Sequence, residues 1–172
     1  MIPFINRLHD GIMLGDGALG TMLYSRGVFI NRCYDELVLS QPEVVQQIHQ
    51  DYIDAGAELI ETNTFGANVI ALSKYGLADK MALINERAVA LARACVDNRD
   101  VFVAGSIGPT GMIVERDLRQ TADRVRDAFV CQAEALAYGG VDLIILETFY
   151  SLHELLIALD ALKRTLQIPI VA

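Results

Sequence analysis

Four segments of this 172-residue sequence place polar side chains directly after short apolar runs. These residues are Asp16 between glycines in MLGDGALG, Asn63 and Thr64 in AELIETNTF, Ser106 and Gly108 in GSIGPTG, and Glu147 after the run LIIL. The carboxyl ends of parallel strands meet at one face of an α/β fold, so these residues would converge there. Carboxylates at Asp16 and Glu147 suit an ammonium group, while the N–H groups of residues 106–108 suit a carboxylate. The pattern predicts a pocket for a small amino acid.

The polar residues also have purely structural interpretations. Asp16 could form a turn, Asn63 and Thr64 could cap the following helix, and GSIGPTG could be a tight turn. Glu147 is harder to explain in this way, because a carboxylate at the end of a buried strand needs a partner. The occurrence of polar residues at the ends of four predicted strands favours a functional role for them over a purely structural one. The predicted substrate-binding residues are Asp16, Asn63, Thr64, Ser106, Gly108, Glu147 and Thr148.

The elements that must position these residues follow from hydrophobic periodicity. Ser40 with Glu43, and Ser151 with Glu154, have capping-box spacing and predict the starts of two helices, the first of which stops at Gly56. Two further helices are expected at about residues 79–96 and 121–138. Short apolar runs predict strands, some including their exit loops, at residues 12–14, 57–65, 101–109, 141–149 and 168–172.

Continuously apolar strands that are each followed by a helix predict an α/β fold with a covered parallel sheet. A doubly wound open sheet and a (β/α)8 TIM barrel both satisfy this pattern. AELIETNTF (57–65) and VDLIILETF (141–149) share Leu, Ile, Thr and Phe at a distance of two strand-helix units, which favours the barrel. A complete barrel takes about 250 residues. We therefore expect the chain to hold roughly the first five strand-helix units of a longer domain.

Composition excludes several classes of protein. The net charge of −8 and the scattered Lys and Arg residues argue against nucleic acid as a partner. The sequence shows neither a signal peptide nor an apolar run long enough to cross a membrane, so we expect no membrane association and a cytoplasmic location. Three widely spaced cysteines are typical of reduced thiols.

The motifs DGALGT, ETNTFGAN, GSIGPTG and ETF, in this order, resemble the homocysteine S-methyltransferase family over residues 11–172. The segment 32–68 is most similar to the methionine-synthase branch and to bacterial enzymes fused to a methylenetetrahydrofolate reductase. The resemblance implies that residues 1–172 are the N-terminal part of a barrel domain that methylates L-homocysteine to methionine. It also implies that Asp16 and Glu147 hold the substrate amino group, while Thr64 and residues 106–109 shape the pocket.

The same resemblance implies a zinc ion, held by cysteine thiolates, that activates the substrate thiol. The family's Asn-Cys and Gly-Gly-Cys-Cys motifs do not occur in this sequence, and we expect Cys33, Cys95 and Cys131 to be structural. The zinc ligands are therefore expected in a C-terminal part of the domain, and this chain alone is expected to be inactive. A methyl donor, with methyltetrahydrofolate favoured and cobalamin as a further cofactor, would be bound by another domain or protein.

Two alternatives stay open. The chain could belong to a phosphate-binding barrel aldolase or isomerase, with GSIGPTG as the phosphate cradle. It could also be a non-catalytic half-barrel that needs a partner chain. Exposed barrel edges would in either case favour a homo-oligomer.

Overall fold

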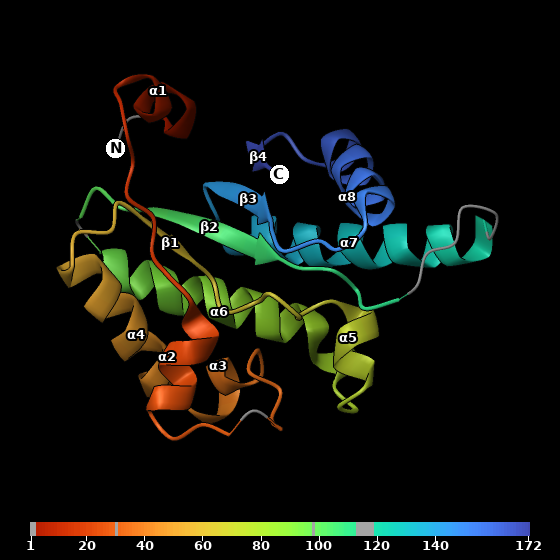
Figure 1. The fold of residues 1–172 in the computed structure, drawn as a ribbon, viewed down its shortest axis with the longest axis horizontal. Coiled ribbons are helices and arrows are strands. Elements are labelled where there is room, and N and C mark those ends of the chain that lie inside the picture. The colour runs from red at the N-terminus through yellow and green to blue at the C-terminus, as the bar shows by residue number, and fades with distance from the viewer. Residues whose placement is uncertain (1–2, 30, 98, 113–118) are drawn as a thin grey trace.

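The computed structural model describes residues 3–29, 31–97, 99–112 and 119–172. Four parallel strands form one sheet in the order β1 (Leu59–Glu61), β2 (Phe102–Ile107), β3 (Leu143–Leu146) and β4 (Ile170–Val171) (Figure 1). Leu59 is in register with Phe102, Ala104 with Leu143, and Ile144 with Ile170. Because the spatial order follows the chain order without a switch point, the sheet is an arc of the barrel type, not a doubly wound sheet.

Four long helices pack against one another in chain order. Contacts join α4 to α6, α6 to α7, and α7 to α8. Five shorter segments complete the described structure, among them a single 3-10 turn, η1. The long helices are α4 (Pro42–Asp54), α6 (Met81–Val96), α7 (Arg119–Gly139) and α8 (Leu152–Thr165), and the short segments are α1 (Phe4–His9), α2 (Leu19–Ser25), α3 (Leu37–Ser40), α5 (Val69–Ser73) and η1 (Ala78–Lys80).

The strands bury different side chains on their two faces. Ile60, Val103 and Ile144 belong to the large core that also contains side chains of α6, α7 and α8. The alternate strand residues Leu59, Phe102, Ala104 and Leu143 form a second, smaller core together with Phe4 of α1. Since side chains alternate along a strand, Glu61 and Ser106 lie on the same face as this smaller core, two residues beyond Leu59 and Ala104.

The predicted strand at residues 12–14 is wrong. Gly15 forms an isolated parallel bridge with Leu59, supported by hydrogen bonds from Glu58 N to Leu14 O (2.8 Å) and from Asp16 N to Leu59 O (2.9 Å). Two hydrogen bonds next to a glycine-rich loop are too few for a ladder. The described residues thus form four strands and one bridge, an open arc in place of the five complete units that we expected.

One of the two predicted helix starts is also wrong. Gln41, not Ser40, is the N-cap of α4, with Pro42 in the first turn. Ser40 is the last residue of α3, and its hydroxyl donates to Glu36 (2.9 Å). The prediction failed because the short helix α3 directly precedes α4 and includes Ser40 as its last residue.

The other predicted start is confirmed. The Ser151 side chain accepts a hydrogen bond from Glu154 N at the start of α8. The Glu154 carboxylate does not return to the cap, as a complete capping box requires. It accepts instead from the backbone N–H (2.8 Å) and the hydroxyl (2.7 Å) of Thr110, which is fully buried. Glu154 therefore fastens the end of the GSIGPTG loop to α8.

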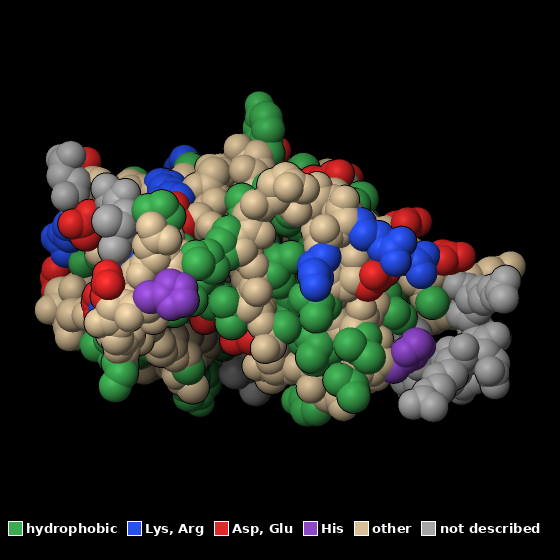
Figure 2. All heavy atoms as spheres, turned by 90° about the horizontal axis from the view of Figure 1, so that it is seen from above, with side chains coloured by type: hydrophobic (Ala, Val, Ile, Leu, Met, Phe, Trp, Pro, Cys, Tyr) green, Lys and Arg blue, Asp and Glu red, His purple; other side chains and the backbone are tan. Residues whose placement is uncertain are grey.

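The surface of the described residues mixes charges. On the face seen in Figure 2, Lys and Arg side chains lie beside Asp and Glu side chains, with hydrophobic side chains exposed between them. None of the helices in the described part of the chain is long and apolar enough to cross a membrane.

Candidate functional site

A pocket of about 1040 Å³ opens at the carboxyl ends of the strands. Six of the seven predicted site residues line it, which are Asp16, Asn63, Thr64, Ser106, Glu147 and Thr148. Gly108 is not among the lining residues. Its N–H donates to Phe65 O (2.8 Å), and a Cβ at this position would lie 2.4 Å from the Phe65 ring. Gly108 is therefore needed for the close packing of Phe65, which itself lines the pocket.

Asp16 is held in place although glycines flank it. Its backbone N–H is part of the bridge to Leu59, and its Oδ2 accepts from Glu61 N (2.9 Å). Gly17 gives room to Tyr52, because a Cβ there would lie 2.9 Å from the Tyr52 hydroxyl oxygen. These contacts offset the conformational entropy that a glycine loop loses on ordering.

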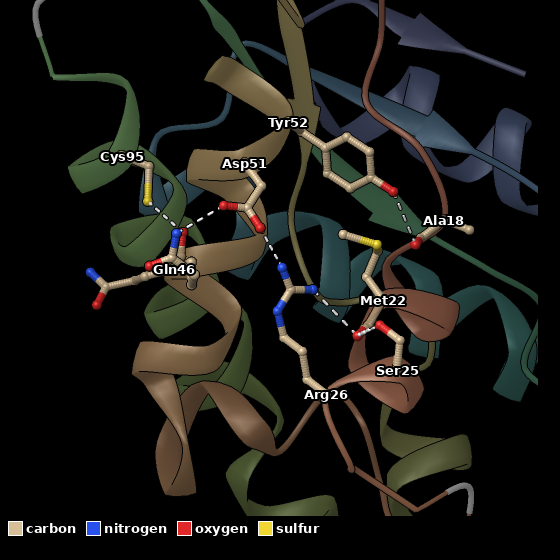
Figure 3. A network of polar contacts seen from close by, with 9 residues as sticks. Ala18, Met22, Ser25, Arg26, Gln46, Asp51, Tyr52 and Cys95 are labelled. Atoms are coloured by element: carbon tan, nitrogen blue, oxygen red, sulfur yellow. Dashed lines mark hydrogen bonds and ion pairs between the residues drawn. The ribbon is translucent and has the colours of Figure 1, made fainter. Parts of the chain in front are cut away.

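The helix that follows Asp16 is fastened to α4. Figure 3 shows Arg26, next to the end of α2, paired with Asp51 of α4 and donating to the carbonyl of Met22. In the same view the Tyr52 hydroxyl donates to Ala18 O (3.2 Å). The loop that carries Asp16 is thus anchored on both sides.

Buried hydroxyl groups connect the ends of β1 and β2. Thr64 Oγ1 donates to Ser106 O (2.8 Å) and lies 2.7 Å from Thr62 Oγ1, which accepts from Ser106 N (3.2 Å). Asn63 Nδ2 donates to Tyr34 O (2.7 Å). Neither Asn63 nor Thr64 caps the next helix, because Asn68 is the N-cap of α5. The capping interpretation of these two residues is wrong, and both shape the pocket wall.

Two of the three backbone N–H groups expected to bind a carboxylate are already engaged. Ser106 N donates to Thr62 and Gly108 N donates to Phe65. These two donors hold the segment that follows β1 and are not directed at a ligand. For the same reason, these two N–H groups are not available to bind phosphate, as the aldolase or isomerase alternative requires.

Three carboxylates meet in the pocket. The Ser106 hydroxyl donates to Glu147, and Glu61 N donates to Asp16. Burial raises the pKa of Asp16 to about 7, with repulsion from Glu147 as a further cause. Burial, together with Glu147 and Asp16, raises the pKa of Glu61 to about 8. Within the described ranges, no Lys or Arg pairs with any of the three.

The residue after Glu147 has a strained backbone. Thr148 has φ +58°, in the left-handed region that β-branched residues rarely adopt. Such conformations persist where the surrounding structure holds them, and they cluster at functional sites. The strained turn directs the chain away from β3 directly after the Glu147 carboxylate.

Sequence reasoning missed one wall of the pocket and two of its carboxylates, Asp35 and Glu61. Cys33, Tyr34 and Asp35 line the wall, where Asp35 accepts from Gly66 N (2.9 Å) and from Cys33 Sγ (3.7 Å). The segment YDELVLSQPE is typical of a connection that leads into a helix. Nothing in the spacing of its residues indicates that Asp35 belongs to a binding site. Glu61 belongs to the motif ETNTF, and the predicted convergence of strand ends was the signal that could have identified it.

The cysteines of this chain do not fit a thiolate-bound metal. Burial and the neighbouring Asp35 carboxylate raise the pKa of Cys33 to about 11, so it remains a thiol. Cys95 donates to Gln46 O on α4, and Cys131 is exposed on α7. The residues that the structure describes contain no group of three or more His, Cys, Asp or Glu side chains arranged to hold a metal ion.

Comparison with known proteins agrees with the motifs. Residues 13–172 match the family model of homocysteine S-methyltransferases. The chain is 32% identical to methionine synthase of Mycobacterium tuberculosis over 170 residues, and 33% identical to that of Mycobacterium leprae over 174 residues. These alignments cover 92% and 94% of the chain but 14% of each relative.

The fold matches that of a solved methyltransferase. The metallated form of the homocysteine methyltransferase MmuM from Escherichia coli superposes with a TM-score of 0.81 at 23% identity. The match covers 96% of this chain and 64% of that one. The oxidised form gives a TM-score of 0.82 at 24% identity. From the family match over residues 13–172 and the identity to the methionine synthases, the chain belongs to the homocysteine S-methyltransferase family.

Proposed function

We propose that this chain forms the homocysteine-binding part of a zinc-dependent S-methyltransferase domain that converts L-homocysteine to methionine. The supporting observation is the cluster of Asp16, Glu61 and Glu147, which the described residues leave without a cationic partner. Buried carboxylates need a counter-charge, and an amino acid substrate brings one in its ammonium group.

The neighbouring residues position this group. Ser106 donates to Glu147 and fixes the carboxylate, while Glu61 N fixes Asp16, so that both face the pocket with restricted motion. An ammonium group between Asp16 and Glu147 places the rest of the substrate against Asn63, Thr64 and Thr148. Fixed partners reduce the entropy lost on binding.

The metal and the methyl donor belong to other parts of the proposed enzyme. A zinc ion would convert the substrate thiol to the nucleophilic thiolate. Because the described residues contain no group of three or more His, Cys, Asp or Glu side chains arranged to hold a metal ion, we propose that the zinc ligands come from outside residues 1–172 and that the isolated chain is inactive. The donor, a methyltetrahydrofolate-linked group with cobalamin as a further cofactor, would be bound by another domain or protein in the cytoplasm.

Isothermal titration of L-homocysteine into the chain, with and without zinc, tests the proposal. We expect weak, zinc-independent binding that Glu147→Ala abolishes. Glu58→Ala is the matched control, because Glu58 is an acidic residue at the opposite end of β1 and pairs with Arg7. Binding that survives in Glu147→Ala, or no binding to the wild-type chain, would contradict the proposed function.

The open edge of the sheet supports association. β4 is the edge strand of the described sheet, and Val171 on β4 and Leu152 and Leu156 on α8 are exposed. Unpaired edges pair readily with other chains. We propose self-association through this edge, for which sedimentation velocity should show a concentration-dependent dimer. A monomer at all concentrations would contradict it.

A further inference from the structure

The proposed ammonium site assigns the substrate contacts to Asp16 and Glu147 and gives no contact to Glu61, the third carboxylate of the same cluster. Glu61 is the last residue of β1, between the segment of Asp16 and strand β2. Its backbone N–H donates to Asp16 Oδ2 (2.9 Å), and it lines the same pocket as Ser106 and Glu147, where the Ser106 hydroxyl donates to Glu147. Glu61 thus lies between the two carboxylates assigned to the substrate.

The charges around Glu61 are negative. Asp16 faces it from the first segment and Glu147 from beyond β3, while β2 contributes the neutral hydroxyl of Ser106. Tyr52 of α4 lies near Asp16 as a neutral phenol. Neighbouring carboxylates that are buried in one pocket cannot all be ionised at low cost, so we expect a proton to be retained among them. The pKa of Glu61 is raised to about 8, with burial as the largest cause and the neighbouring carboxylates of Glu147 and Asp16 as further causes.

A proton therefore takes the place of a cation in the empty pocket at neutral pH. When a positively charged ligand enters, the same carboxylates can ionise fully, because the ligand supplies the missing charge. Exchange of one proton for one ammonium group leaves the net charge of the pocket unchanged. This exchange reduces the number of unpaired buried anions in the ligand-free state and provides partners for the buried cation in the bound state.

We propose that Glu61 is a third carboxylate of the ammonium site, and that the substrate's ammonium group displaces to solvent the proton that Glu61 shares with Glu147. The inference rests on the proposed function. One bond breaks and one forms: the O–H bond of the Glu61 carboxylic acid breaks as its proton forms a new O–H bond with water, and N–H groups of the ligand then donate hydrogen bonds to the carboxylates. The pocket thereby selects against ligands that have a thiol and a carboxylate but no amino group.

Calorimetric titration in two buffers of different ionisation enthalpy counts the protons released. At about pH 7 we expect L-homocysteine to release about one proton or more from the wild-type chain and clearly fewer from Glu61→Gln, in which Asp16, with a pKa raised to about 7, still contributes. Between about pH 6 and about pH 8, wild-type affinity should rise by up to about tenfold per pH unit, and Glu61→Gln should show a flatter profile. Glu58→Gln, the same substitution at the other end of β1, should behave like the wild-type chain.

A second ligand gives a test without any variant. The des-amino analogue of homocysteine should release no proton and should bind more weakly as the pH rises. Homocysteine binding without proton release, or with release unchanged in Glu61→Gln, would overturn the role of Glu61 while leaving the proposed function intact. No homocysteine binding at all would overturn both.

Carbon-13 NMR of the labelled carboxyl groups tests the shared proton without ligand. The Glu61 signal, identified by its loss in Glu61→Gln, should titrate near neutral pH and shift to a lower pH in Glu147→Gln. Titration of Glu61 at the ordinary pKa of a glutamate would contradict the inference, independently of the result of homocysteine binding.

Discussion

At the amino end of the sheet Glu58 and Asp142 pair with Arg7 and Arg93, whereas at the carboxyl end Glu61 and Glu147 face each other. The Arg7 guanidinium lowers the pKa of Glu58, while burial and neighbouring carboxylates raise the pKa of Glu61. Both ends carry carboxylates on or next to the same two strands, but only one end supplies their counter-charges from the described chain.

The difference separates stability from function. Acidic residues at the amino end are satisfied in the folded protein and contribute to its stability. Those at the carboxyl end are buried without a cation, which costs stability and makes the site ready for a charged ligand. Substitution at the two ends should therefore have effects of opposite sign.

The largest effect is expected at the amino end. Asp142 Oδ2 accepts from Val103 N (2.7 Å), Asp142 Oδ1 pairs with Arg93 (2.9 Å), and Val103 is fully buried. Asp142→Ala leaves that N–H without its acceptor and should lower the free energy of unfolding by about 2 kcal/mol. Urea denaturation measures this, with Asp142→Asn as the control that retains an acceptor. An equal loss in both variants would assign the effect to charge alone.

At the carboxyl end, Glu61→Gln should stabilise the chain at alkaline pH. The folded-state pKa of Glu61 is raised from 4.5 to about 8, so the folded chain keeps a proton that the unfolded chain releases. Its contribution to stability is therefore present below the unfolded pKa and is lost as the pH rises toward about 8.

The expected gain for Glu61→Gln is on the order of 1 kcal/mol at alkaline pH and near zero at acidic pH. Thermal unfolding as a function of pH measures the difference from wild type. The raised pKa of Asp16 and that of Asp35 leave a residual pH dependence of the same sign. A variant less stable than wild type at every pH would contradict the comparison.

A smaller gain is expected at Thr148. Glycine adopts positive φ without the steric cost that Thr148 carries, so Thr148→Gly should raise the free energy of unfolding by up to about 1 kcal/mol. Thr148→Ala removes the same side-chain atoms beyond Cβ but keeps the strain, and serves as the control. Chemical denaturation that ranks Ala above Gly would show that the turn is not strained.

The smallest effect is expected for Glu58→Gln. Its pair with Arg7 (2.6 Å) lies at the surface, where salt screens the attraction. Urea denaturation at low and high salt should show a slight loss of stability that disappears at high salt. A loss as large as that of Asp142→Ala would mean that the pair of Glu58 and Arg7 contributes more to stability than its exposure indicates.

Much of this comparison was accessible from sequence, although not all of it. The apolar runs around Ile60, Val103 and Ile144 predicted β1, β2 and β3 because continuous burial leaves an unmistakable pattern. The first strand failed because Gly15 and Gly17 limit pairing to a bridge. The short helices α1, α2, α3 and α5 were not predicted, since each is too short to show helical periodicity.

Within the pocket, six of the seven predicted residues reached the lining because the ends of parallel strands must converge. The backbone donors were not predictable. Whether Ser106 N faces a ligand or Thr62 depends on a hydrogen bond between residues 44 positions apart. Asp35 reaches the pocket through a similarly distant contact with Gly66, 31 positions along the chain.

The sequence alone determined the order of the elements, the family motifs and the edge of the sheet at which the polar residues gather, because these depend on local periodicity and composition. The tertiary structure decided which carboxylates are ion-paired and which are buried together without a cationic partner among the described residues. Glu58 and Glu61 are three residues apart in one segment, yet Arg7 reaches the first and Glu147 the second. The charge state of a buried group is set by its neighbours in space, and only the folded chain brings those neighbours together.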